Sequence, residues 1–151
     1  MKIVTYSEAV ETDIPDLINL LSVLFGIEKD FKPDFSRQEN GLALILKNHT
    51  LATIQVARNS AGKAVGMVSA QLVISTAQGT ASAWIEDMVI DAEFRGCGIG
   101  KQLLQKTLDW AKSKGATRAQ LLVDIENTEA LGYYQHLNWE STQLQARRVF
   151  F

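Results

Sequence analysis

The stretch Arg95-Gly96-Cys97-Gly98-Ile99-Gly100-Lys101 decides the interpretation of this 151-residue sequence. It follows an apolar run ending at Ile90, which is typical of a β-strand, and precedes a helical pattern that begins near Leu103. At such a junction the backbone N–H groups and the helix dipole converge on an anion. Glycine permits the backbone angles and the close approach that such a turn needs. We therefore expect a pyrophosphate-sized group to bind here, although the glycines could also serve only the close packing of strand and helix.

Two widespread phosphate motifs can be tested against these residues. A dinucleotide fingerprint requires a third glycine where Lys101 stands. A P-loop requires glycine at Arg95 and serine or threonine at Gln102. Neither motif is present, and the pattern that fits is Arg-x-x-Gly-x-Gly.

The N-terminal part of the sequence predicts a strand followed by a helix. β-Branched residues favour a strand from Lys2 to Tyr6. Thr12 or Asp13 is expected to cap a helix with apolar residues at helical spacing, which Gly26 ends. Charged residues and a proline then predict an irregular segment from Ile27 to Phe35.

A second helix and three antiparallel strands are expected next. Ser36 and Glu39 form the pattern of a capping box for a helix ending near Lys47. Alternation of apolar and polar residues, separated by turn residues, then predicts strands. These strands are Leu51 to Arg58, Ala64 to Thr76 and Ala81 to Ile90.

The C-terminal part predicts a helix from the glycines to Gly115, then a strand from Ala119 to Val123. Asn127 is expected to begin another helix that runs to Leu137, and Trp139 to Phe151 is expected to hold two closing strands. The sequence therefore predicts one α/β domain over residues 1–151, with a mixed, mostly antiparallel sheet flanked by about four helices.

A second motif supports a family resemblance. The segment Asn127-Thr128-Glu129-Ala130-Leu131-Gly132-Tyr133-Tyr134-Gln135-His136-Leu137-Asn138-Trp139 resembles the pattern Asn-x-x-Ala-x-x-(aromatic)-Tyr-x-x-Leu-Gly-(aromatic) of the GCN5-related N-acetyltransferase (GNAT) family. Asn138 replaces the usual glycine, and asparagine tolerates a left-handed helix cap well. The predicted order of elements resembles the family fold over most of the chain.

This resemblance implies that acetyl-coenzyme A is the cosubstrate, with no metal ion. The glycine-rich turn would hold the pyrophosphate through main-chain amides, and the preceding strand would pair with the pantetheine arm. The residues that the resemblance assigns to the coenzyme are Met88, Val89, Ile90, Arg95, Gly96, Cys97, Gly98, Ile99, Gly100, Lys101, Asn127 and Tyr134. Taken as structure alone, Asn127 is a helix cap and Tyr133 a core aromatic residue.

Acetyl transfer to an amine needs a proton acceptor, a stabilised oxyanion and a proton for the departing thiolate. By resemblance, Tyr134 would be the acid and Glu86 the base, directly or through water. Period-two alternation puts Glu86 and Asp87 on opposite faces of their strand, so only one can face the acceptor. A surface carboxylate without a catalytic role remains the alternative for Glu86. Cys97 is interpreted as a small side chain in a tight turn rather than a nucleophile.

The segment from Phe25 to Phe35 would meet the acceptor if the family arrangement applies. Its acidic residues could attract a cation and its aromatic residues could cover it, although a solvated loop carries such charges too. These residues are Glu28, Asp30, Asp34, Phe31 and Phe35. A small-molecule amine or a peptide amine would fit, and the sequence does not choose between them.

The composition limits the other partners. A net charge of −2 and a pI near 5.7 argue against nucleic acid. Cys97 is the single cysteine, and neither a signal peptide nor a membrane-spanning stretch is recognised, so a cytoplasmic protein is expected. The aromatic end from Arg147 to Phe151 could serve a homodimer interface or a buried last strand.

Two other functional readings stay open. A non-catalytic acetyl-CoA-binding sensor would keep the turn and Asn127 but could lose the residues that move protons. The presence of Tyr134 and Glu86 favours an enzyme. A subunit that works only in complex with a partner is the third reading.

Overall fold

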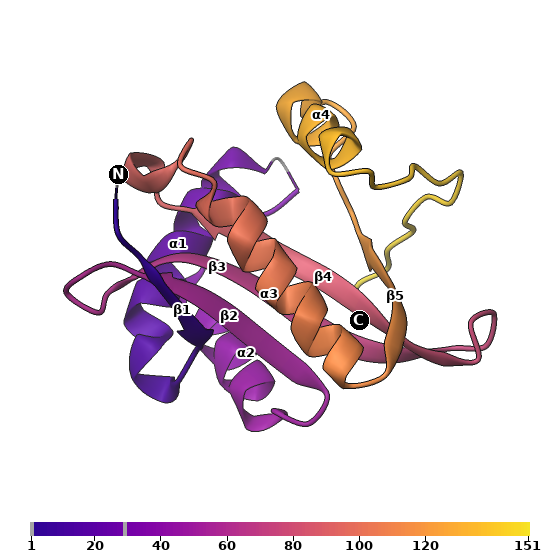
Figure 1. Ribbon diagram of the computed structural model, residues 1–151, viewed down its shortest axis with the longest axis horizontal. Helices are drawn as coiled ribbons and strands as arrows, with labels where there is room; N and C mark the ends of the chain where they lie inside the picture. Colours follow the sequence, from indigo (N-terminus) through magenta and orange to yellow (C-terminus); the bar gives the residue numbers. More distant parts are fainter. Residues whose placement is uncertain (1, 29) are drawn as a thin grey trace. The chain divides into compact units, whose positions relative to one another are not determined.

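The computed structural model describes residues 2–28 and 30–151. It contains eleven elements in chain order (Figure 1), which are β1 (Thr5–Glu8), η1 (Glu11–Asp13), α1 (Ile14–Ile27), α2 (Phe35–Lys47), β2 (Ala52–Arg58), β3 (Ala64–Ser75), β4 (Thr80–Ile90), η2 (Ala92–Phe94), α3 (Ile99–Ser113), β5 (Ala116–Leu121) and α4 (Thr128–His136). The chain divides into two compact units, residues 1–120 and residues 121–151, and each is described by itself.

The first unit is built on a five-stranded sheet in the order β1-β2-β3-β4-β5. The pairs β1–β2, β2–β3 and β3–β4 are antiparallel, and short turns join β2 to β3 and β3 to β4. The long β3–β4 hairpin pairs residues from Gly66–Ile90 at one end to Ser75–Thr80 at the other. The α/β fold class with a mostly antiparallel sheet is therefore confirmed.

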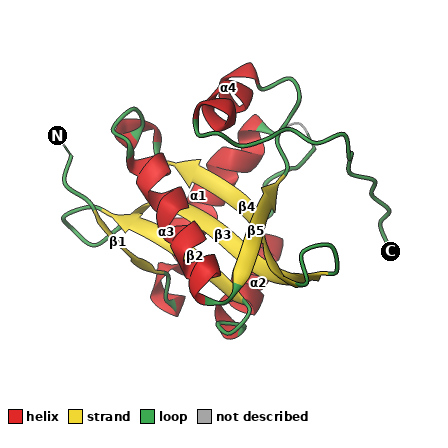
Figure 2. Ribbon diagram, turned by 45° about the vertical axis from the view of Figure 1, so that its right-hand side comes forward, coloured by secondary structure: helices red, strands yellow, loops and turns green. Residues whose placement is uncertain are grey.

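Helices cover both faces of the sheet. Figure 2 shows α3 across one face, with α1 and α2 behind the other. On the α1–α2 side, Leu17 and Leu42 pack with Ile54, Met67 and Val89 of the sheet in one buried cluster. Burial of such a side chain contributes about 1.5–3 kcal/mol, so this cluster fixes both helices against the strands.

Helix α3 buries one apolar stripe on the opposite face. Ile99 and Leu103 are among its buried residues, at the spacing of one helical turn. Gly66 of β3 lies beneath them, and a Cβ atom there would come within 2.7 Å of the Ile90 Cδ1 atom and 3.6 Å of the Leu103 Cδ2 atom. The glycine therefore makes room for the start of α3 and the end of β4, where the predicted coenzyme turn begins.

An ion pair fixes the start of α1 to the sheet. Asp13, only 5% exposed, accepts hydrogen bonds of 2.5 and 2.7 Å from the guanidinium of Arg58 at the end of β2. Its carboxylate also accepts a bond of 2.8 Å from the backbone N–H of Val10. The hydrogen bond from Arg58 is the main reason why the pKa of Asp13 lies below its usual value. Asp13 thus precedes α1 as predicted, but its side chain makes no cap bond to that helix.

The predicted capping box of α2 is wrong. The helix begins at Phe35, so Ser36 already lies inside its first turn. The cap is Asp34, whose carboxylate accepts from the N–H of Arg37 at 3.1 Å, while the N–H of Asp34 donates to the Gln38 side chain at 2.7 Å. Lys29, within the segment predicted to be irregular, lies outside the described residues.

The second unit contains α4, and the predicted helix there is confirmed. Asn127 caps it by accepting a bond of 3.0 Å from the N–H of Ala130. Asn138 ends it with a φ of 64°, the left-handed cap predicted for this position. The N–H of Trp139 donates to the carbonyl of Tyr134 at 2.9 Å, which completes the cap.

The two closing strands predicted from Trp139 to Phe151 are absent from the described residues 138–151. A strand forms only where its backbone groups find a partner strand, and alternation of residue types supplies no partner by itself. Several large apolar residues of this segment are exposed, namely Leu144, Val149, Phe150 and Phe151.

Candidate active site

The glycine-rich turn joins β4 to α3 as predicted. Gly96 and Gly98 have φ angles of 73° and 76°, in the left-handed region that favours glycine. A Cβ atom at either position would meet no atom within 4 Å, so the backbone conformation, and not crowding, calls for glycine in this structure. The space in front of the turn is therefore open to a ligand.

Hydrogen bonds hold both ends of this turn. The N–H of Asp91 donates to the carbonyl of Val65 at 2.8 Å, and the Arg95 side chain donates to the carbonyl of Ile90 at 2.9 Å. The N–H of Gln102 bonds to the carbonyl of Gly98 at 3.2 Å. The N–H groups of Ile99, Gly100 and Lys101 belong to the first turn of α3, where a helix supplies no acceptor of its own. These donors are available to an anion at the helix N-terminus.

Two other residues of the turn are less informative. Cys97 is exposed, and its thiol lies 3.5 Å from the carbonyl oxygen of Arg95. Lys101 is exposed on the first turn of α3. Neither side chain contacts a nucleophile or a base in the described part of the chain, which agrees with the interpretation of Cys97 as a small residue in a tight turn.

Strand β4 contains a β-bulge near its C-terminal end, before the chain reaches this turn. Glu86 pairs with Ser69 and Val89 pairs with Met67, so two residues of β4, Asp87 and Met88, oppose one residue of β3. Asp87 has a φ of 55°, which is uncommon for a residue with a side chain. The sequence prediction missed this bulge, and strict alternation of faces therefore does not hold at Asp87.

The two carboxylates at the bulge have different surroundings. Glu86 is exposed and accepts a bond of 2.6 Å from the indole N–H of Trp84. Asp87 is half-buried, and its pKa is raised to about 7, first by burial and then by the negative charges of Glu86 and Glu28. Proximity to Glu28 also shows that the chain after α1 lies near the bulge. Asp87 is thus the carboxylate in this strand whose proton affinity suits neutral pH.

The residues predicted to pair with pantetheine lie on β4 between the bulge and the turn. Val89 is 5% exposed and belongs to the core cluster under α1. Met88 and Ile90 are half-buried. Glu86, these residues and the turn thus form one continuous stretch of chain from β4 to the start of α3.

The segment predicted to meet the acceptor has partly structural roles. Asp34 caps α2, and Phe31 packs against Phe25 with ring centroids 5.5 Å apart. Phe35 is 64% exposed. Glu28 follows the last residue of α1, and its charge acts on Asp87.

Within the second unit, Tyr134 lies in an aromatic cluster. Its ring centroid is 5.4 Å from that of Tyr133 and 5.8 Å from that of Trp139. Burial, with a smaller contribution from Tyr133, raises the pKa of Tyr134 to about 12, so its phenol keeps its proton at neutral pH. The Tyr133 hydroxyl is buried and has no hydrogen-bond partner among the described residues. Asn127 uses its side-chain oxygen for the cap of α4, as the structural reading predicted.

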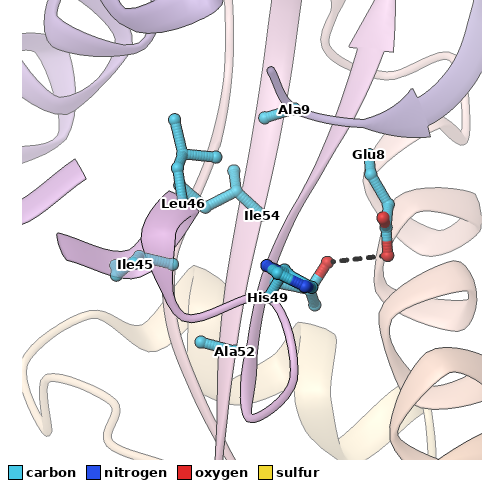
Figure 3. Close-up of a pocket in the computed structure, with 8 residues that line it drawn as sticks. Glu8, Ala9, Ile45, Leu46, His49, Ala52 and Ile54 are labelled. Atoms are coloured by element: carbon cyan, nitrogen blue, oxygen red, sulfur yellow. Dashed lines mark hydrogen bonds between the residues drawn. The ribbon is translucent and has the colours of Figure 1, made fainter. Parts of the chain in front are cut away.

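A small, solvent-open pocket lies between β1, α2 and β2 (Figure 3). Thr53 donates to Glu8 across 3.4 Å on one side of it, and His49 lies beside them. None of the residues that line this pocket is a predicted site residue. In residues 2–28 and 30–151, no helix is long and apolar enough to cross a bilayer, and no three His, Cys, Asp or Glu side chains gather as metal ligands would.

A family model for the acetyltransferase (GNAT) family matches residues 14–139, which include the bulge, the turn and α4. The chain belongs to the GNAT family. Among GNAT relatives, it is 34% identical over 84 residues to an uncharacterised N-acetyltransferase of Methanocaldococcus jannaschii, covering 55% of this chain and 37% of that protein. It is also 34% identical over 90 residues to a glucosamine 6-phosphate N-acetyltransferase of Trypanosoma brucei brucei, covering 57% of each protein.

The GNAT fold is also found in solved structures. A possible acetyltransferase from Clostridium difficile 630 superimposes with a TM-score of 0.86 at 18% identity, covering 99% of both chains. Similarity at this level of identity shows the fold alone. The matches to the two curated relatives span about a third to just over half of their lengths.

Proposed function

We propose that this chain is an acetyl-CoA-dependent N-acetyltransferase that passes the acetyl group to a primary amine by direct attack. The observation that carries the proposal is the continuous stretch from the β4 bulge through two left-handed glycines to the start of α3, in a member of the GNAT family. In this stretch, the bulge disrupts the hydrogen bonding between β3 and β4, which leaves backbone groups for a ligand. The N-terminus of α3 provides N–H groups for an anion.

The coenzyme would lie along this stretch. The main-chain amides from Arg95 to Lys101 would hold its pyrophosphate, and the main chain of Met88, Val89 and Ile90 would pair with pantetheine. One N–H of that strand segment would polarise the acetyl carbonyl. Asn127 retains its side-chain NH₂ group for the coenzyme, since its oxygen caps α4. The proposal assigns no role to a metal ion.

Two residues would handle protons. Glu86, exposed at the bulge, would take the proton that the amine loses, directly or through water. Tyr134 would donate to the departing thiolate, and its pKa of about 12 keeps the phenol protonated for that role. Tyr134 matches the family position of the acid, and this match supports its assignment.

The acceptor is proposed as an amine that approaches the acidic segment after α1. Because one relative is named a glucosamine 6-phosphate N-acetyltransferase, amino sugars and their phosphates are the first acceptors to test. Polyamines, amino acids and peptide N-termini are the acceptors to test next. A single domain over residues 1–151, a cytoplasmic location and a homodimer remain predictions.

The direct experiment measures thiol release from acetyl-CoA with this panel of amines. Release that depends on the amine supports the enzyme. Heat of acetyl-CoA binding without thiol release across the panel would favour the sensor instead.

Gly98→Asp tests the coenzyme turn. The new carboxylate would enter the open space in front of α3 and repel the pyrophosphate, so calorimetry should show loss of coenzyme A binding while far-UV circular dichroism stays unchanged. Gly79→Asp is the matched control, because Gly79 also has a positive φ, of 68°, and open space around its Cβ position, but lies in the β3–β4 turn. Equal binding by both variants would remove the glycine-rich turn from the site.

A further inference from the structure

Asp87 lies next to the proposed base, at the point where β4 stops being regular. In a regular strand, Ile85 and Val89, four residues apart, would face the same side. Their partners on β3, Ala70 and Met67, are three residues apart and face opposite sides. The bulge at Asp87 and Met88 produces this change of face, and it holds Asp87 at a φ of 55°. Bulges and left-handed residues with side chains occur preferentially where a side chain is aimed for function.

Within the described residues, the charged groups that act on Asp87 both disfavour a further negative charge. Glu86 on its own strand and Glu28 after α1 are the charged groups that act on it within the described residues. In the same part of the chain, Asp87 forms no ion pair with a lysine or arginine. A half-buried carboxylate with two acidic neighbours binds a proton more tightly than an exposed one.

We propose that Glu86 and Asp87 act as one proton-accepting pair in the transfer reaction, with the proton coming to rest on Asp87. This inference rests on the proposed acetyltransferase function. The exposed Glu86 would meet the amine, and the half-buried Asp87 would hold the proton away from it.

The protons balance as follows. An ammonium acceptor loses two protons as its nitrogen bonds to the acetyl carbon and the carbon–sulfur bond breaks. One goes to the Glu86–Asp87 pair and later to solvent. The other replaces the proton that the proposed acid, Tyr134, gives to the thiolate. The products are the amide, coenzyme A and one proton in solution.

A base is most effective when its pKa lies near the working pH. The pKa of about 7 at Asp87 meets this condition, since Asp87 is ionised just above neutral pH and still binds a proton strongly. Below that range Asp87 already carries a proton and cannot accept another. The reaction should therefore slow as the pH falls through about 7.

The experiment records kcat/KM against pH for the wild type, Asp87→Asn and Glu86→Gln, with the best amine of the panel. Wild-type kcat/KM should rise through a step near pH 7. Asp87→Asn should lose this step and at least about 10-fold in kcat, because general bases contribute about 100-fold or more. Acetyl-CoA affinity should stay within about twofold. Glu86→Gln should move the remaining step to lower pH, because removing a neighbouring negative charge lowers the pKa of Asp87.

Asp109→Asn, an exposed carboxylate on α3, is the control that should leave both the step and the rate unchanged. Carbon-13 NMR of the aspartate carboxyls gives a readout without turnover. The resonance absent from Asp87→Asn should titrate near pH 7, and it should do so at lower pH in Glu86→Gln and in Glu28→Gln.

A step that survives in Asp87→Asn, or an Asp87 resonance that titrates near the ordinary value of 3.8, would overturn the paired base. Either result leaves the acetyltransferase function intact. Wild-type protein that binds acetyl-CoA but releases no thiol with any amine at any pH would overturn the function, and the proton transfer with it.

Discussion

Replacing Asp87 with asparagine should stabilise the protein, and only above acidic pH. The folded-state pKa of Asp87, about 7, lies above the ordinary value of 3.8, so the folded protein binds this proton more tightly than the unfolded chain. Between these two values, the folded state holds a proton that the unfolded state has released. The free energy of unfolding therefore falls as pH rises through this window, and the loss is complete above about pH 7.

The size of this effect follows from the shift. About three pKa units, at about 1.4 kcal/mol each, give a limit of about 4 kcal/mol. Asp87 is half-buried, and water still reaches part of its carboxylate, so we expect about 2 kcal/mol from removing its charge. Asparagine has nearly the same shape and also tolerates a φ of 55°, so the backbone contribution cancels.

Thermal unfolding of wild type and Asp87→Asn at about pH 4 and pH 8 measures the difference. At pH 4 the melting temperatures should nearly coincide. At pH 8 the variant should melt about 4–8 °C higher, as about 2 kcal/mol implies for a chain of this length. Asp109→Asn should show no such dependence on pH. An equal difference at both pH values, or a variant less stable at pH 8, would refute the assignment of a raised pKa to Asp87.

Two further variants test other parts of the structure. Arg58→Ala should lower the free energy of unfolding at pH 7 by about 3 kcal/mol, because it leaves Asp13 buried without its partner; urea titration measures this, and a loss below about 1 kcal/mol would contradict it. Since the pKa of Asp13 is lowered in the folded state, this contribution is present above about pH 4 and should disappear as pH falls further. Tyr134→Phe should reduce kcat at least about 10-fold and weaken acetyl-CoA binding much less, and equal changes in both would remove Tyr134 as the acid.

The sequence predicted the parts of the fold that depend on local chemistry. The backbone has a positive φ at Gly98 and Asn138, which lie at helix ends, and few residues other than glycine and asparagine tolerate that conformation. Such positions can therefore be recognised from the sequence without knowledge of the tertiary structure. Helices α1 and α3 follow apolar periodicity. The turn from β4 to α3 could be identified for the same reasons.

Features that depend on pairing between distant residues were missed. The bulge at Asp87 and Met88 appears only when the register of β4 against β3 is known, because either strand alone shows ordinary alternation. The expected strands between Trp139 and Phe151 were wrong for a related reason, since their residue types favour a strand but no partner strand is present in the described residues. The N-cap of α2 is Asp34 and not the predicted Ser36. Aspartate and serine are similarly favoured at an N-cap, so residue type alone does not decide which of them precedes the first turn.

The bulge has consequences for both stability and the proposed chemistry. With the bulge, Val89 packs in the core under α1, while Asp87 lies near Glu86 and Glu28, where its pKa is raised. A carboxylate in such a place lowers stability at neutral pH, and removing a destabilising residue costs function only where activity needs it. The stability and rate measurements on Asp87→Asn therefore have to be read together. A variant that gains stability and loses the pH step supports a proton-accepting role, whereas one that gains stability and keeps full activity shows that the strain and the charge at Asp87 serve no step of the reaction.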